Sequence, residues 1–236
     1  MNRRVLLTDF SRVYANEGFV DFLEREALPF DRIDLSDIEG TACYCDENAA
    51  AEIAARLQDA RPESLPKVRW IDSGDYHYMS YLLSLLEKEP FHLVLVDNHP
   101  DNQEPAFGGI LSCGSWVKAL RERNPLVRDI LTIGPEGCPR GIPEGWLAAR
   151  KGERVYVSLD KDVMDRPWAR TDWSQGTFSL DQVKEMLREI FGSGMEVVAV
   201  DVCGELTEGK GATAEDFEVN LKTNIELQLF INNYLN

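Results

Sequence analysis

Residues 91–101 read FHLVLVDNHPD, an apolar run that ends in acidic and imidazole side chains. The apolar residues 93–96 predict a buried strand, and Asp97, His99 and Asp101 follow it on alternate positions. This spacing places the three side chains at one point on the edge of a sheet. Carboxylates together with an imidazole are a ligand set that divalent metals bind. The stretch therefore predicts a strand that delivers a metal site.

Strand and helix patterns alternate along the chain. Apolar runs predict strands at residues 5–7, 32–35, 67–71, 93–96, 129–133, 154–159 and 196–202. Helical spacing predicts helices at residues 16–28, 47–60, 78–88, 115–123, 179–191 and 215–235, and a loop at 136–152. The alternation predicts one α/β domain over residues 1–236, with a mainly parallel sheet and helices on both faces. In such sheets, ligands bind beyond the carboxyl ends of the strands.

The composition limits the partners and the compartment. The net charge is −16, which argues against nucleic acid or an anionic membrane surface as a partner. A cationic substrate is compatible with this charge, although a solvated acidic surface is the simpler and favoured explanation. No apolar run approaches the roughly 18 residues that span a membrane, and no secretory leader is visible. The five cysteines form no paired framework, so a cytoplasmic location with free thiols is the expectation.

Polar clusters follow four of the predicted strands. They are SGDYH at 73–77, DNHPD at 97–101, SLDKDVMD at 158–165 and DVCGE at 201–205. Each one alone is compatible with a turn or a helix cap. Because the carboxyl ends of parallel strands meet at one edge, the four together supply imidazoles and carboxylates to one place. This coincidence favours a metal site over four unrelated turns.

The four clusters also resemble, in the same order, motifs of the arginase/agmatinase (ureohydrolase) family. DNHPD resembles the D-A-H-x-D motif, SLDKDVMD the S-x-D-x-D-x-x-D-P motif, SGDYHYMS the G-G-D-H-S motif and DVCGEL the D-V-x-E element. The resemblance spans residues 73–205 and implies a three-layer, arginase-like domain with a sheet of about seven to eight strands. It further implies two manganese ions bridged by a hydroxide.

The resemblance implies roles for individual residues. The metal ligands carry over to His77, Asp97, His99, Asp101, Asp160 and Asp162, with Asp97 and Asp160 bridging. Two metals lower the pKa of a shared water, which then attacks the trigonal carbon of a guanidinium or an amide. Asp101 would steer this water and take its proton. Glu205 would face a cationic guanidinium, carried by a small molecule or by a peptide, and a homo-oligomer is the implied assembly.

Departures from the family motifs leave three questions open. The first motif has one residue too many, so either His77 or Tyr76 fills the first ligand position, and the chain binds two metals or one. The histidine that shuttles protons in the family is absent, and Cys113 is the nearest candidate, with a structural thiol as the alternative. An extra Gly204 precedes Glu205, which leaves its contact with the substrate open.

Three functions are compatible with these motifs. The first is a manganese-dependent hydrolase of a guanidino group, or of a related amidino or amide C–N bond. The second is a catalytically impaired relative that acts as a binding or regulatory protein. The third is a phosphatase that uses Asp160 and Asp162 as nucleophile and acid, although it leaves His77 unexplained. Trp168 and Trp173 either wall a pocket for a cationic group or pack a long loop.

Overall fold

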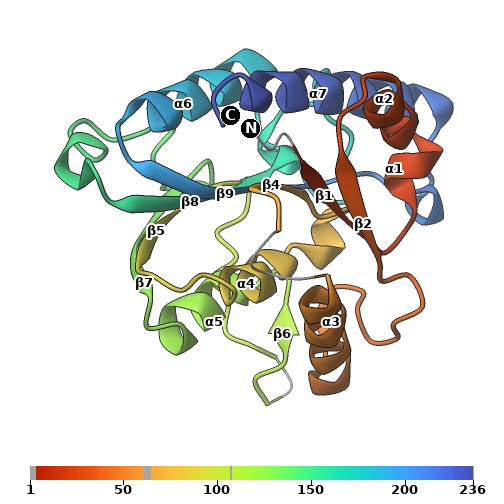
Figure 1. The fold of residues 1–236 in the computed structure, drawn as a ribbon, viewed down its shortest axis with the longest axis horizontal. Helices are drawn as coiled ribbons and strands as arrows, with labels where there is room; N and C mark the ends of the chain where they lie inside the picture. The colour runs from red at the N-terminus through yellow and green to blue at the C-terminus, as the bar shows by residue number, and fades with distance from the viewer. Residues whose placement is uncertain (1–3, 61–64, 107, 236) are drawn as a thin grey trace.

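A seven-stranded parallel sheet runs through the middle of the protein, as a computed structural model shows (Figure 1). The structure describes residues 4–60, 65–106 and 108–235. In spatial order the strands are β2 (Phe30–Asp34), β1 (Val5–Asp9), β4 (Val68–Trp70), β9 (Glu196–Cys203), β8 (Arg154–Asp160), β5 (Phe91–Val96) and β7 (Val127–Ile133). Every neighbouring pair in the sheet is parallel. The predicted α/β fold is therefore confirmed.

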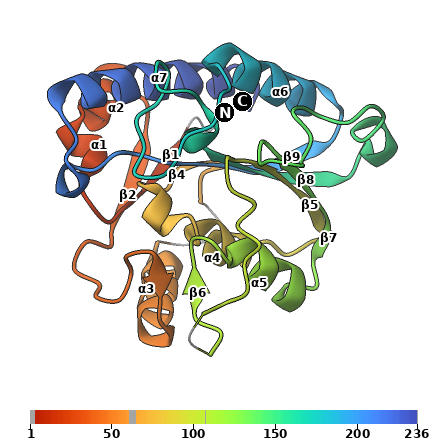
Figure 2. The ribbon, with the colours of Figure 1, turned by 180° about the vertical axis from the view of Figure 1, so that it is seen from behind.

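Helices cover both faces of the sheet, which gives three layers. One layer holds α1 (Val13–Asn16), α2 (Phe19–Arg25), α6 (Leu180–Gly192) and α7 (Ala214–Asn232). Figure 2 shows, from behind, the opposite layer of α3 (Glu47–Asp59), α4 (Met79–Ser84) and α5 (Trp116–Arg123). Each layer has its own apolar core against the sheet. Burial on both faces explains why β5 reads as a continuous apolar run.

Local sequence signals set the ends of several helices. The Asp46 side chain accepts a hydrogen bond from the amide of Ala49 at 2.8 Å and so caps α3. Ser179 opens α6 with a capping box that Gln182 completes. The helix predicted at residues 16–28 is interrupted instead, because Gly18 has a φ of 87° between α1 and α2.

Two short strands were not predicted. β3 (Tyr44–Cys45) and β6 (Leu111–Ser112) pair antiparallel and lie outside the main sheet. Two residues are too few for an alternating pattern to show in a sequence. Just beyond this pairing, the amide of Cys113 donates to the carbonyl of Cys43 at 3.0 Å. The small sheet thus brings two distant loops together beside the candidate site.

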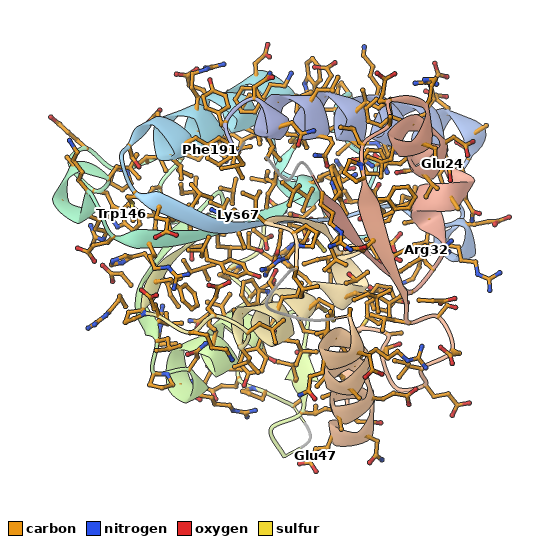
Figure 3. The ribbon with its side chains drawn as sticks, viewed as in Figure 1. Glu24, Arg32, Glu47, Lys67, Trp146 and Phe191 are labelled. Carbon is orange, nitrogen blue, oxygen red and sulfur yellow. The ribbon has the colours of Figure 1, made fainter. Side chains whose placement is uncertain are left out.

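Side chains fill the space between the sheet and its two helical layers (Figure 3). On α6, the ring of Phe191 lies 6.5 Å from that of Phe230 on α7, which joins the two helices of that layer. In the residues that the structure describes, no helix combines the length and the apolar character needed to cross a membrane.

Candidate metal centre

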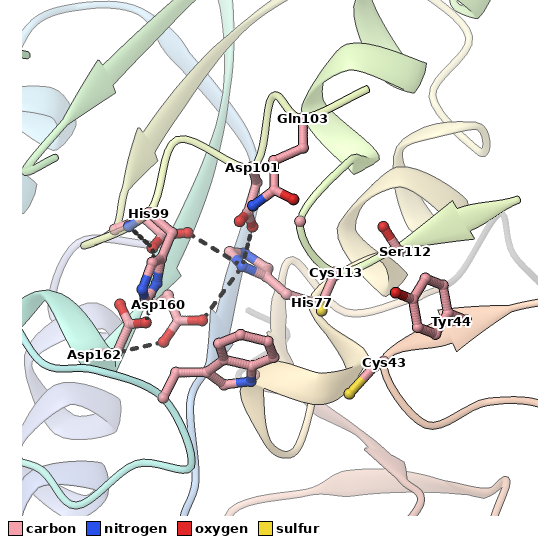
Figure 4. Close-up of a pocket in the computed structure, with 14 residues that line it drawn as sticks. Cys43, Tyr44, His77, His99, Asp101, Gln103, Ser112, Cys113, Asp160 and Asp162 are labelled. Atoms are coloured by element: carbon pink, nitrogen blue, oxygen red, sulfur yellow. Dashed lines mark hydrogen bonds and ion pairs between the residues drawn. The ribbon is translucent and has the colours of Figure 1, made fainter. Parts of the chain in front are cut away.

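A pocket of about 170 Å³ opens beyond the carboxyl ends of the central strands (Figure 4). All six predicted metal ligands line it, namely His77, Asp97, His99, Asp101, Asp160 and Asp162. The remaining lining residues are uncharged: Cys43, Tyr44, Gly74, Gln103, Ser112, Cys113, Gly114 and Trp173. The fold therefore gathers the predicted ligands from three separate stretches of sequence into one cavity.

His77 forms the centre of the first ligand group. Its Nδ1 atom lies 3.0 Å from Asp101 Oδ2, and 3.3 Å from both Asp97 Oδ2 and Asp160 Oδ2 (Figure 4). The imidazole is buried, as are the three carboxylates. Three acidic oxygens around one ring nitrogen form a donor set that can bind a divalent metal.

The structure shows which residue of the first motif lies next to the carboxylates. The short 3-10 turn η2 (Gly74–Tyr76) follows β4 and absorbs the extra residue of this motif. Tyr76 then points away from the pocket and stacks on Phe10, with ring centroids 4.1 Å apart. Asp75 instead accepts a hydrogen bond from Trp173 Nε1 at 3.0 Å. His77, and not Tyr76, therefore lies among the carboxylates.

A serine fixes the orientation of the His77 ring. His77 Nε2 lies 2.9 Å from Ser158 Oγ, and Ser158 Oγ lies 3.0 Å from Ser80 Oγ. With Nε2 held this way, Nδ1 is directed at the carboxylates. Ser158 is the first residue of the motif SLDKDVMD. The sequence did not predict its contact with His77.

His99 forms a second ligand group beside the first. Its Nδ1 atom lies 2.7 Å from Asp162 Oδ2 and 3.7 Å from Asp97 Oδ1, and its Nε2 lies 2.9 Å from Ser174 Oγ. Asp97 therefore faces His99 with one carboxylate oxygen and His77 with the other. Two ligand groups that share Asp97 are the arrangement expected of a two-metal site.

Neighbouring residues orient the remaining carboxylates. Trp116 Nε1 donates to Asp101 Oδ2 at 2.7 Å, and this contact has no local signal in the sequence. Asp101 itself has a φ of 45°, which is uncommon outside glycine. The amide of Asp162 donates to Asp160 Oδ1 at 2.9 Å. The backbone of the turn after β8 thus holds the Asp160 carboxylate in place.

Burial and mutual repulsion disfavour ionisation of these carboxylates in the absence of a cation. Burial, with the nearby charge of Asp101, raises the pKa of Asp97 to about 7. Burial and the charge of Asp97 likewise raise the pKa of Asp162 to about 7. The hydrogen bond to Asp162 raises the pKa of His99 to about 9. A bound cation would reverse this balance, because it favours the ionised carboxylates.

The residues present fit a divalent metal. Asp97 Oδ2 is buried and lies 3.3 Å from His77 Nδ1, but it accepts no well-aligned hydrogen bond among the residues that the structure describes. A buried, unsatisfied carboxylate oxygen is costly, and a cation is one partner that would satisfy it. Carboxylate oxygens mixed with imidazole nitrogens suit manganese, iron or zinc.

Glu205 is not brought to the pocket. Its side chain is fully buried, forms an ion pair with Lys161 Nζ and accepts a hydrogen bond from Asn224 Nδ2 at 2.8 Å. Gly204 makes this path possible, with a φ of 98° and a position where a Cβ would lie 2.3 Å from Asp160 Oδ1. In this arrangement Glu205 is not among the residues that line the pocket.

Cys113 does line the pocket, as predicted for a candidate proton carrier. Burial, reinforced by the charge of Asp101, raises the pKa of its thiol far above the usual value. A thiol that stays protonated is a poor base at neutral pH, so the environment favours the structural alternative. Of the two tryptophans, Trp173 lines the pocket, whereas Trp168 packs against the core beside α7.

Comparisons of the sequence with known proteins find little similarity. No protein-family model matches the chain. An uncharacterized protein of Thermotoga maritima is 28% identical over 162 residues, which are 61% of this chain. The alignment spans 64% of that relative's length.

Solved structures match over nearly the whole chain. Formimidoylglutamase from Bacillus subtilis matches with a TM-score of 0.67 at 14% identity, over 98% of this chain and 87% of its own. Proclavaminate amidino hydrolase from Streptomyces clavuligerus gives 0.63 at 18% identity, over 97% and 90%. Arginase from Bacillus caldovelox gives 0.63 at 13% identity, over 97% and 98%.

The protein thus has the arginase-like fold of the ureohydrolases. At such low identities the matches establish the fold, and they confirm the resemblance read from the four motifs at that level. Within this fold, the buried histidine and aspartate groups of the pocket are able to hold metal.

Proposed function

We propose that this protein is a divergent ureohydrolase, a metal-dependent hydrolase that cleaves a C–N bond at a trigonal carbon. Two manganese ions are the proposed cofactors, and a guanidino, amidino or amide group is the proposed substrate. The observation that carries the proposal is the convergence of His77, His99 and four aspartates on one pocket. The motifs that supply these six residues resemble those of the family in sequence and in order.

The side chains divide the work between binding and orientation. His77 and His99 would bind metal through Nδ1, because Ser158 and Ser174 hold the opposite ring nitrogens. Bound manganese would lower the pKa of a shared water and so supply a nucleophile at neutral pH. Asp101, which Trp116 holds in place, would accept the proton of the attacking water.

A second candidate is a binding or regulatory protein that has lost catalysis. Two observations favour it: the burial of Glu205 against Lys161 and the protonated state expected of Cys113. The family resemblance implies a substrate contact for the motif position of Glu205 and a proton-transfer role for that of Cys113. The phosphatase interpretation, by contrast, has no support from the fold, since Asp160 and Asp162 lie in one pocket with both histidines.

Metal quantification and activity separate these candidates. We expect the wild-type protein to retain about two manganese ions per chain after dialysis, in line with a two-metal site. Asp97→Asn and Asp160→Asn should each lose bound metal, because each removes a charged ligand oxygen. Asp165→Asn is the matched control, since Asp165 belongs to the same motif but is exposed and outside the pocket.

A panel of guanidino, amidino and amide compounds, including peptide-borne arginine, then tests turnover by release of urea or ammonia. Turnover with full metal content supports the hydrolase. Full metal content without turnover on any compound supports the non-catalytic candidate. Retention of all manganese by both aspartate variants would show that the site is misplaced.

A further inference from the structure

The end of β9 presents a cysteine beside the candidate metal centre. Cys203 pairs with Asp160 in the parallel register of β9 and β8. Paired residues of neighbouring strands point to the same face of a sheet, and the strands lie about 4.8 Å apart. The Cys203 thiol is therefore on the same face as the Asp160 carboxylate, whose Oδ2 lies 3.3 Å from His77 Nδ1.

Three possible ligand atoms form a compact group at this point. One atom each of His77, Asp160 and Cys203 lies within 4.8 Å of the other two, and all three residues are buried. Zinc bonds of about 2.0–2.3 Å hold tetrahedral ligand atoms roughly 3.3–3.7 Å apart. These distances differ by no more than about 1.5 Å, so small side-chain movements would close the group around an ion.

Gly204 allows the end of β9 to approach β8 this closely. A Cβ at this position would lie 2.3 Å from Asp160 Oδ1 and 2.9 Å from the amide nitrogen of Lys161. Any larger residue would therefore push apart the two strand ends that carry Asp160 and Cys203. The extra glycine of this motif thus keeps the sulfur beside the carboxylate.

The thiol of Cys203 is able to give up its proton at little cost to its neighbours. Its S–H donates to the carbonyl of Ser73 at 3.2 Å, and the same carbonyl also accepts from the amide of Tyr76 at 3.0 Å. The carbonyl therefore keeps a donor when the thiol proton leaves. Burial, reinforced by the charge of Asp160, raises the pKa of the free thiol. A coordinating divalent metal overcomes this effect, because it deprotonates the thiol that binds it.

We propose that Cys203 is a seventh metal ligand, which binds an ion together with His77 and Asp160. The inference rests on the proposed metal-dependent function and deepens it, since the family motifs imply six other ligands. Cys203 does not line the open pocket, so its sulfur would reach the ion from the buried side. A sulfur–metal bond forms, the S–H bond breaks and the proton passes to solvent. Because thiolate is a soft ligand, it strengthens the binding of cobalt or zinc more than that of manganese.

Titration of the metal-free protein with Co²⁺ tests for the sulfur ligand by absorption spectroscopy. A cobalt–thiolate bond gives a strong charge-transfer band in the near ultraviolet, which nitrogen and oxygen ligands do not give. We expect this band in the wild-type protein and its loss in Cys203→Ser. Cobalt affinity at this position should fall at least about tenfold in the variant, since even a partner behind a metal ligand contributes about 10–100-fold. Manganese affinity should fall by a smaller factor, because manganese gains less from thiolate.

Cys45→Ser is the matched control. Cys45 is a buried free thiol in the same apolar core as Cys203, but it does not line the pocket. The control should keep both the band and the cobalt affinity. X-ray absorption of the zinc-loaded wild-type protein provides a test that needs no folded variant, with a sulfur neighbour of zinc expected at about 2.3 Å.

The outcomes separate this inference from the proposed function. Bound cobalt without a charge-transfer band, or zinc with only nitrogen and oxygen neighbours, overturns the sulfur ligand and leaves the hydrolase proposal standing. A band of equal strength in Cys203→Ser also overturns it, because the sulfur would then come from another cysteine. Failure of the wild-type protein to bind either cobalt or manganese would overturn both proposals. A band that is kept in Cys45→Ser and lost in Cys203→Ser supports the inference.

Discussion

Replacement of Ser158 by alanine tests whether the His77 ring is held for metal binding. Ser158 is fully buried, and its Oγ lies 2.9 Å from His77 Nε2. When Nδ1 binds a metal, Nε2 carries the proton and donates it to this oxygen. Loss of the partner behind a metal-bound histidine lowers metal affinity about 10–100-fold, equal to about 1.4–2.8 kcal/mol. We expect manganese binding to weaken by that amount in Ser158→Ala.

The assay is a titration of the metal-free protein with Mn²⁺, in which the electron paramagnetic resonance signal of the free ion reports the unbound fraction. Ser112→Ala is the control, because Ser112 lines the same pocket but its hydroxyl bonds to Ser115, at 2.7 Å. Loss of the Ser158 hydrogen bond should also lower the free energy of unfolding by about 1 kcal/mol. A less stable Ser158→Ala protein with undiminished manganese affinity would refute the role assigned to His77.

Two further substitutions probe the supports of the site. Gly204→Ala should lower the free energy of unfolding by about 1–3 kcal/mol, because alanine is strained at this positive φ and its Cβ would press on Asp160. Gly209→Ala is the control, because open space surrounds Gly209, and its free energy of unfolding should change little. Chemical denaturation measures both values. Trp116→Phe keeps an aromatic side chain but removes the hydrogen bond to Asp101, and should weaken metal binding by about 10–100-fold in the same titration. A stable Gly204→Ala protein or an unaltered affinity in Trp116→Phe would contradict these supports.

The sequence predicted those parts of the site that depend on contiguous residues. Asp97, His99 and Asp101 follow β5 directly, so a strand pattern and a spacing were enough to place them together. The same holds for Asp160, which ends β8, and for Asp162 in the turn that follows. Parallel strands then bring both stretches to one edge of the sheet, a consequence of fold class alone.

The remaining parts depend on backbone geometry that residue types do not specify. The 3-10 turn after β4 decides that His77 enters the pocket and Tyr76 leaves it. The positive φ of Gly204 turns Glu205 toward Lys161. The family motif had instead implied that Glu205 faces a substrate. The contact of Trp116 with the site likewise arises only when α5 packs against the sheet.

The proposed function requires that this pocket bind two metal ions between the histidines and aspartates. Diffraction at the manganese absorption edge, from crystals grown with Mn²⁺, tests it most directly. We expect two anomalous peaks in each chain, one bounded by His77, Asp97 and Asp101 and the other by Asp97, His99 and Asp162. No peak among these residues, or manganese bound elsewhere, would contradict it.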